Sequence, residues 1–398
     1  MQPQKLPFNP HALEAFVVLV GERRWLARMA EIASRAACGA RVGQMLRQRH
    51  GLELAIERLR GMLSRPPSVA EQRAAQLAAD AVLLHRQLGA RGRARLNDCL
   101  ASALTDDGTL VPLFHLLRTA NLQRARGFGV AFAGLERGAP FDLLISRGAL
   151  HAEVACDVVS AEAGRLVHRA AWSHLTDLVD CEVRAWMATH PGRHLLKMTL
   201  QQGLCRAEAD TLAAMHQRIR RLLETQGRRD DDAAAMLRLE PLVLAQSQKD
   251  AGLLISLRHE FGPEAHLSVT AAKPSLFVMA ARAARADEVA VAVRQRLASI
   301  VQARLSGTRP GILAMFVEDT DLGEWRGLRD RLELEGEARQ FLACKAARPV
   351  IAVTCASRFE LFGMAAPAAA EDGELRFRNP AHPEAKAAAL APAVLSSV

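Results

Sequence analysis

Three carboxylates in the middle of the chain have the types and spacing that could hold a divalent cation. Asp142 opens one short apolar run, and Glu153 and Asp157 fall in a second run at 152–159. A tight turn at 146–148 joins the two runs and predicts a hairpin. Carboxylates that converge from neighbouring strands are typical ligands of Mg²⁺ or Mn²⁺, which polarises a phosphate and activates a water. The predicted chemistry is hydrolysis of a phosphodiester.

Such a site also needs a cation that steadies the charge developing on the phosphate. Lys197, in a strand-like run at 194–200, is the only lysine between residues 6 and 248. It is therefore the candidate for this role. The metal ligands we predict are Asp142, Glu153 and Asp157, and the predicted catalytic residues are Asp142, Glu153, Asp157 and Lys197.

A longer pattern surrounds these residues. The chain has Asp142, then Val154-Ala-Cys-Asp157, then Ser160-Ala-Glu-Ala-Gly-Arg165, and then His168-Arg169. This resembles the PD-(D/E)XK, or restriction-endonuclease-like, nuclease superfamily, in which one branch carries a pattern of the form D…VECK…SADKGR..HR. The resemblance covers residues 127–201. It implies a mixed sheet flanked by helices, in the order helix, strand, strand, strand, helix, strand.

Two positions depart from the superfamily pattern. Ala155 stands where the pattern has its metal-binding Glu, and Asp157 stands where it has its catalytic Lys. Without those side chains a hydrolase of this type loses most of its transition-state stabilisation. Side chains alternate along a strand, so Glu153 and Asp157 flank position 155 on one face. The resemblance implies either a catalytically dead domain or a rewired site, and its register predicts that position 155 borders a polar cleft beside Asp142.

Basic residues supply candidate contacts to a nucleic acid. Arg165, His168 and Arg169 lie at the start of a predicted long helix, where they could meet a phosphate, and a basic stripe follows at 218–229. The 52 Lys and Arg against 43 Asp and Glu give a net charge of +9. This balance permits an anionic partner without demanding one. DNA or RNA and a protein are all open as partners, and the sequence does not fix the oligomeric state.

Composition excludes several classes of protein. The chain has no tyrosine, which excludes any mechanism with a phenolic nucleophile, and it has no GxxxxGK[ST] phosphate loop. Its seven cysteines are scattered and never spaced CxxC, which predicts reduced thiols in a cytoplasm rather than disulfides or structural zinc. The longest apolar runs are about six residues, against roughly 20 for a transmembrane helix, so no membrane span is expected.

Patterning predicts an α/β fold with four regions along the chain. Residues 1–95 form a helical N-terminal region, with apolar residues at helical spacing. Residues 96–230 form the nuclease-like domain with its central mixed sheet flanked by helices. Residues 231–364 alternate strands and helices in a C-terminal α/β region. The Ala- and Pro-rich tail at 365–398 is predicted to be flexible.

Taken together, these features favour a cytoplasmic protein of the nuclease superfamily with a degenerate, inactive site. Such a pseudoenzyme would bind nucleic acid or serve as a scaffold. Two alternatives remain open. One is an active Mg²⁺- or Mn²⁺-dependent nuclease with a rewired site, and the other is a protein-interaction module that binds no nucleic acid.

Overall fold

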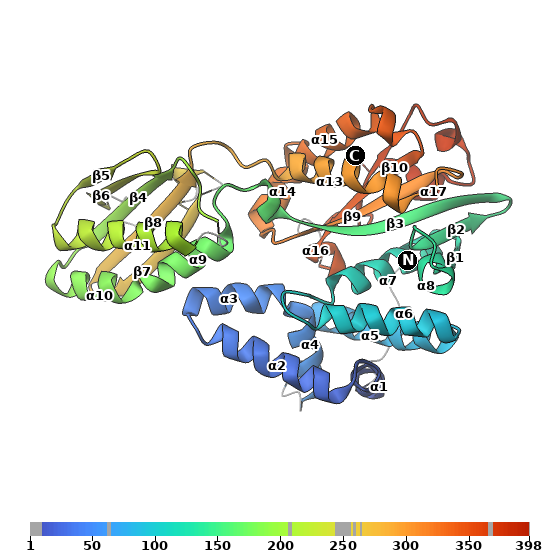
Figure 1. Ribbon diagram of the computed structural model, residues 1–398, viewed down its shortest axis with the longest axis horizontal. Helices are drawn as coiled ribbons and strands as arrows, with labels where there is room; N and C mark the ends of the chain where they lie inside the picture. The colour runs from blue at the N-terminus through green and yellow to red at the C-terminus, as the bar shows by residue number, and fades with distance from the viewer. Residues whose placement is uncertain are drawn as a thin grey trace. The chain divides into compact units, whose positions relative to one another are not determined.

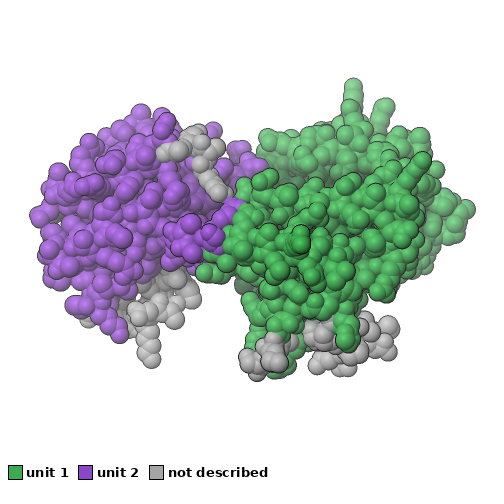
Figure 2. Space-filling view, turned by 60° about the horizontal axis from the view of Figure 1, so that its bottom comes forward, with its two compact units in different colours: residues 1–33, 47–161, 290–398 green, residues 34–46, 162–289 purple. Residues whose placement is uncertain are grey.

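The chain forms two compact units, which Figure 2 shows in different colours. Unit 1 consists of residues 1–33, 47–161 and 290–398, and unit 2 consists of residues 34–46 and 162–289. The structure is a computed structural model, which describes residues 10–61, 65–205, 209–242, 256–257, 260–262, 265–364 and 369–397. Over this described part, no helix combines the length and the apolar character needed to cross a membrane.

The N-terminal region is helical, as the spacing of its apolar residues predicts. Its helices are α1 (Pro10–Val20), α2 (Glu22–Ala36), α3 (Ala40–Arg49), α4 (Gly51–Arg60), α5 (Val69–Gln87), α6 (Ala90–Ala103) and α7 (Val111–Ala125). The predicted capping box is present, because the Ser68 side chain accepts from the backbone of Glu71 and the Glu71 side chain accepts from Ser68. Phe16 of α1 and Leu77 of α5 are fully buried in the main core of unit 1.

Unit 1 contains a six-stranded mixed sheet in the order β1-β2-β3-β9-β10-β11 (Figure 1). Its strands are β1 (Gly129–Ala131), β2 (Leu143–Arg147), β3 (Leu150–Ser160), β9 (Gly311–Glu318), β10 (Val350–Ser357) and β11 (Leu375–Arg378). The first three form an antiparallel meander, which includes the predicted hairpin. β9 runs parallel to both β3 and β10, and β11 returns antiparallel to β10.

One face of this sheet packs against the N-terminal helices. Ala152 and Val154 of β3 are fully buried in the same core as the helices. Because side chains alternate along the strand, Glu153, Ala155 and Asp157 lie on the opposite face. The other helical elements of unit 1 are α8 (Ala133–Arg137), α13 (Val289–Arg304), α14 (Leu322–Asp330), α15 (Glu333–Leu342), η2 (Lys345–Ala347), α16 (Arg358–Leu361), η3 (Pro383–Lys386) and α17 (Ala391–Val394).

Unit 2 has its own five-stranded sheet in the order β5-β6-β4-β8-β7. Its strands are β4 (Arg193–Leu200), β5 (Arg229–Asp231), β6 (Ala235–Pro241), β7 (His266–Ala272) and β8 (Ser275–Ala283). Its helical elements are η1 (Ala161–Gly164), α9 (Arg169–Leu178), α10 (Asp180–Thr189) and α11 (Ala209–Glu224). Leu196 and Met198 of β4 are buried with Leu175 of α9 and Ile219 of α11, so this unit has a core of its own.

The structure corrects the predicted composition of the central sheet. The sequence places the strand at 194–200 in the same sheet as the hairpin, but that strand is β4 and belongs to unit 2. In unit 1, the helix and strand that come after β3 are α13 and β9. Residues 162–289, which belong to unit 2, separate β3 from them along the chain. The predicted boundaries after residues 95 and 230 do not separate the two units.

The prediction of a flexible tail is wrong for residues 369–397. Leu375 and Phe377 are buried on β11, which pairs with β10, and Leu390 and Val394 are fully buried. Within this region rich in Ala and Pro, residues 375–378 alternate between apolar and basic side chains, which is typical of an edge strand. Residues 365–368 and 398 of the predicted tail lie outside the described residues.

Candidate functional site

Asp142 lies directly before β2, and its carboxylate reaches β3. Oδ2 accepts a hydrogen bond from the backbone N–H of Cys156 at 2.7 Å. The same oxygen accepts from Nη2 of Arg304, on α13, at 2.6 Å. Burial raises the pKa of Asp142, and the Arg304 guanidinium acts in the opposite direction. The carboxylate predicted to bind a metal is therefore held by a peptide group and a guanidinium.

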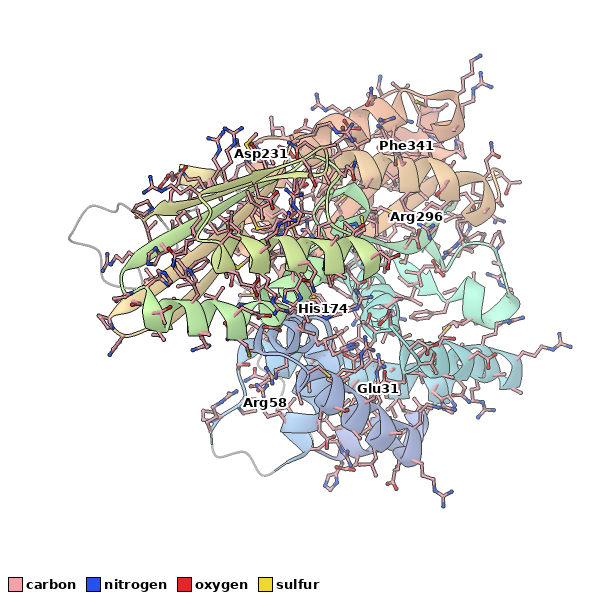
Figure 3. The ribbon with its side chains drawn as sticks, turned by 60° about the vertical axis from the view of Figure 1, so that its left-hand side comes forward. Glu31, Arg58, His174, Asp231, Arg296 and Phe341 are labelled. Carbon is pink, nitrogen blue, oxygen red and sulfur yellow. The ribbon has the colours of Figure 1, made fainter. Side chains whose placement is uncertain are left out.

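Asp157 has a second guanidinium as its partner. Arg296 of α13, labelled in Figure 3, donates from Nε to Oδ2 at 2.6 Å and from Nη2 to Oδ1 at 3.1 Å. This two-point contact is the geometry in which an arginine binds a carboxylate most strongly. It raises the pKa of Arg296. Arg296 and Arg304 are eight residues apart, so they lie on one i, i+4, i+8 ridge of the helix.

Glu153 is fully buried and is satisfied by the loop that follows α13. Its carboxylate accepts from the backbone N–H of Ser306 at 2.8 Å and also from the Ser306 hydroxyl. Nη1 of Arg309 lies 3.6 Å from Oε1 of Glu153. The three predicted acids thus contact one segment, residues 296–309, but each has partners of its own. In the described ranges, no three His, Cys, Asp or Glu side chains are grouped so that they could hold a metal ion.

Ala155 has no exposed surface and lies in register with Leu313 of β9. The expectation that position 155 borders a polar cleft is therefore wrong. The residue sits in the interior of a central strand, which has β2 antiparallel on one side and β9 parallel on the other, and the sequence did not predict the pairing with β9. A methyl group at this position closes the gap between Glu153 and Asp157 with apolar volume, where the superfamily pattern has a carboxylate.

Lys197 lies on β4 of unit 2, whereas the strand next to β3 is β9. Its Nζ is 3.1 Å from Oε2 of Glu240 and 5.5 Å from the centre of the Phe261 ring. These contacts are those of a lysine that covers an apolar surface and pairs with a neighbouring acid. The predicted pairing of Lys197 with the three acids rested on β4 extending their sheet, and the observed topology removes that premise.

The predicted nucleic-acid contacts at the start of the long helix are engaged within unit 2. The Arg165 side chain is 1% exposed and pairs with Glu162, so its guanidinium is not available to a phosphate. The backbone N–H of Arg169 donates to the Glu162 carboxylate at 2.8 Å, and Nδ1 of His168 lies 4.0 Å from it. The basic stripe is also paired with acids, in the ion pairs Arg218–Asp230, Arg218–Asp232, Arg220–Glu224, Arg221–Asp230 and Arg229–Asp231.

A second polar cluster, missed by the sequence reasoning, lies where β3 and β9 end together. Glu318 accepts from the Thr109 hydroxyl at 3.2 Å, and Asp319 accepts from the Ser160 hydroxyl at 2.6 Å. Arg49 approaches Asp319 at 3.3 Å. Asp319 has φ +59°, a conformation that is costly for a residue other than glycine. The sequence signal was the acidic run directly after an apolar strand, at the strand end where α/β sheets commonly bind ligands.

The Glu318 side chain is expected to make the free energy of unfolding depend on pH. Burial, with the neighbouring charge of Asp319, raises its pKa from 4.5 to about 7 against the opposing effects of Arg49 and Thr109. The folded form binds this proton more tightly than the unfolded form, so the contribution is fully present below pH 4.5 and lost as pH rises through 7. The free energy of unfolding of Glu318→Gln, minus that of wild type, should rise between pH 5 and 8 by at most about 3 kcal/mol. Urea unfolding at four pH values measures this difference, and a constant difference would contradict the assignment.

Comparison with known proteins finds no family model, no curated protein and no solved structure that matches the chain.

Proposed function

We propose that this chain is a nuclease-superfamily protein of PD-(D/E)XK type whose site is inactive. The connectivity of unit 1 supports the proposal. Apart from the short helix α8 between β1 and β2, its elements α7, β1, β2, β3, α13 and β9 follow in the order helix, strand, strand, strand, helix, strand. β9 lies parallel beside β3, with α13 in the connection that joins them. This is the order that the sequence resemblance implies, interrupted by residues 162–289.

The observation that carries the inactive interpretation is the pairing of two of the acids with guanidinium groups. Arg304 contacts Asp142 and Arg296 contacts Asp157, where a nuclease would use the carboxylates to hold a cation. An arginine stays charged at every pH at which the protein is folded, so it balances these acids permanently. It cannot activate a water as a metal ion does. In the proposed site the guanidinium groups balance the negative charge of the carboxylates, as metal ions would, but they do not support hydrolysis.

Purified full-length protein is therefore expected to leave plasmid DNA, single-stranded DNA and RNA intact in the presence of Mg²⁺ or Mn²⁺. The measurement is a gel assay with the Asp142→Ala variant run in parallel. Cleavage by wild type that disappears in Asp142→Ala would instead establish the alternative, an active nuclease with a rewired site. Equal trace cleavage by both proteins would indicate a contaminant.

Removal of the two arginines tests the charge balance directly. In Arg296→Ala/Arg304→Ala the acids lose their partners, and Mn²⁺ should then bind and raise the melting temperature. At 100 times the dissociation constant the stabilisation would be about 2.7 kcal/mol. Wild type should show no such shift. Arg294→Ala is the matched control, because it removes the same side chain from the same helix but breaks only the pair with Glu337. A Mn²⁺ shift in wild type that is lost in Asp142→Asn/Asp157→Asn would contradict the proposal.

The net charge of +9 permits a nucleic-acid partner. Filter binding of DNA and RNA across a salt series tests for it. Binding through several arginines must weaken steeply as salt rises, because each contact to a phosphate releases counterions. Absence of binding at low salt would instead assign the protein a scaffold role that depends on protein partners.

A further inference from the structure

Cys205 and His168 form a close pair in unit 2. Sγ of Cys205 lies 3.7 Å from Nε2 of His168, and Nδ1 on the other side of the same ring lies 4.0 Å from Oε2 of Glu162. The His168 side chain is 28% exposed, and Cys205 is partly exposed, so solvent and small solutes reach the pair. A thiol, an imidazole and a carboxylate in this sequence are the groups from which activated cysteine nucleophiles are built.

The backbone holds the two side chains in this arrangement. The N–H of His168 donates to the carbonyl of Leu204 at 2.9 Å, and the N–H of Leu204 donates to the carbonyl of Leu166 at 2.7 Å. These bonds form a short parallel bridge between the segments that carry the thiol and the ring. Gly203 has φ +80°, and a Cβ at this position would lie 2.3 Å from the Leu166 carbonyl oxygen. Only glycine permits this close approach.

The carboxylate is also fixed. Glu162 pairs with the buried guanidinium of Arg165 and accepts the backbone N–H of Arg169 at 2.8 Å. Its oxygen Oε2 therefore remains on the Nδ1 side of His168. A carboxylate in that place favours the ring orientation in which Nε2 faces the sulfur.

The other cysteines have surroundings of a different kind. Burial raises the pKa of Cys156 well above its usual value and that of Cys355 to about 12, which makes both unreactive. Burial also raises the pKa of Cys99. Cys38, Cys181 and Cys344 are exposed, and the thiols of Cys38 and Cys344 donate to the backbone carbonyls of Ser34 and Gln340. Exposure alone would therefore rank Cys38, Cys99, Cys181 and Cys344 above Cys205 in reactivity.

We propose that Cys205 is a nucleophilic thiol activated by His168, and that it is a site of oxidation by a peroxide. His168 takes the thiol proton and leaves a thiolate. The sulfur attacks one peroxide oxygen, an S–O bond forms and the O–O bond breaks, and the departing oxygen leaves as water or an alcohol after it takes the proton from the imidazolium. The sulfur is oxidised to a sulfenic acid and the peroxide is reduced.

Competitive alkylation tests the first half of the proposal. Full-length protein is treated with a limiting amount of iodoacetamide, and each cysteine is quantified by mass spectrometry across pH 5 to 9. Cys205 should react about tenfold faster than Cys38 and Cys344 at pH 7 despite its lower exposure. His168→Gln should remove this advantage and shift the pH profile of Cys205 upward. His174→Gln is the matched control, because it makes the same substitution at an exposed histidine of α9 (Figure 3).

Oxidation tests the second half. Hydrogen peroxide is added in the presence of dimedone, which traps sulfenic acids. We expect a dimedone adduct on Cys205 in wild type and in His174→Gln, and loss of most of it in His168→Gln. The proposal would be overturned by alkylation of Cys205 no faster than that of Cys38, or by fast alkylation without a dimedone adduct. Equal rates in wild type and His168→Gln would also overturn it, and circular dichroism confirms that the variant is folded.

Discussion

Ala155→Glu is expected to prevent unit 1 from folding. Ala155 has no exposed surface and lies on a central strand between two neighbours, in register with Leu313. The new carboxylate would be buried on the same face as Glu153 and Asp157, so it would lose its hydration and meet like charges. An unpaired buried charge costs several kcal/mol, which is comparable with the whole stability of a typical domain. Soluble yield and thermal unfolding measure the effect.

His151→Glu is the matched control for this substitution. His151 is exposed on the same strand, so the same carboxylate there remains in water. We expect a change within about 0.5 kcal/mol, as for most surface substitutions. If Ala155→Glu folded and gained Mn²⁺ binding, position 155 would open onto a cation site. That outcome would restore the polar cleft that the sequence predicts.

Arg118→Met should cause the second large loss of stability. Arg118 on α7 is only 2% exposed, and its Nε donates to the Glu360 carbonyl at 3.3 Å. Burial lowers its pKa, and the nearby charges of Glu374 and Glu360 oppose that effect. Glu374 is itself 1% exposed and also pairs with Arg126. Removal of Arg118 leaves the Glu360 carbonyl without this donor and the buried carboxylates with less compensating charge, which costs roughly 1–3 kcal/mol.

Urea unfolding of Arg118→Met and Arg124→Met separates the charge effect from the effect of changing helix α7. Arg124 lies on the same helix but is exposed, and it donates to the Asn121 side chain. Its substitution should change the free energy of unfolding by no more than about 0.5 kcal/mol. Similar losses in the two variants would mean that the buried guanidinium contributes no more than an exposed one.

The local elements of the fold could be predicted from short stretches of sequence. Ser68 and Glu71 have the spacing of a capping box, and the turn at 146–148 between two apolar runs indicates a hairpin. The sheet to which a strand belongs could not be predicted in this way. The run at 194–200 and the run at 312–317 are both apolar and of similar length. Only tertiary packing decides that the second, and not the first, pairs with β3.

In the candidate site too, the local arrangement could be predicted from the sequence and the distant contacts could not. Alternation along β3 places Glu153 and Asp157 on one face, and this needs no knowledge of the rest of the chain. The partners of the acids come from far away, because Arg296 is 139 positions beyond Asp157. An arginine on a helix is usually in water, so nothing local marks Arg296 or Arg304 as a partner of the acids. Lys197 is the candidate because it is the only lysine between residues 6 and 248 and lies on the next predicted strand, and the insertion removes that strand from the sheet of the acids.

The insertion of residues 162–289 also sets an order of events on the ribosome. When β3 emerges, only β2 is available to pair with it, and residues 161–310 must be made before β9 can cover its other edge. All the strands of unit 2 are synthesised in that interval, so that sheet can close first. Pairings between distant segments form slowly, and an open strand edge invites association with other chains. The nascent chain therefore carries an exposed β3 edge for about 150 residues of elongation, which take roughly 8 to 30 s. In this period a chaperone has most to protect.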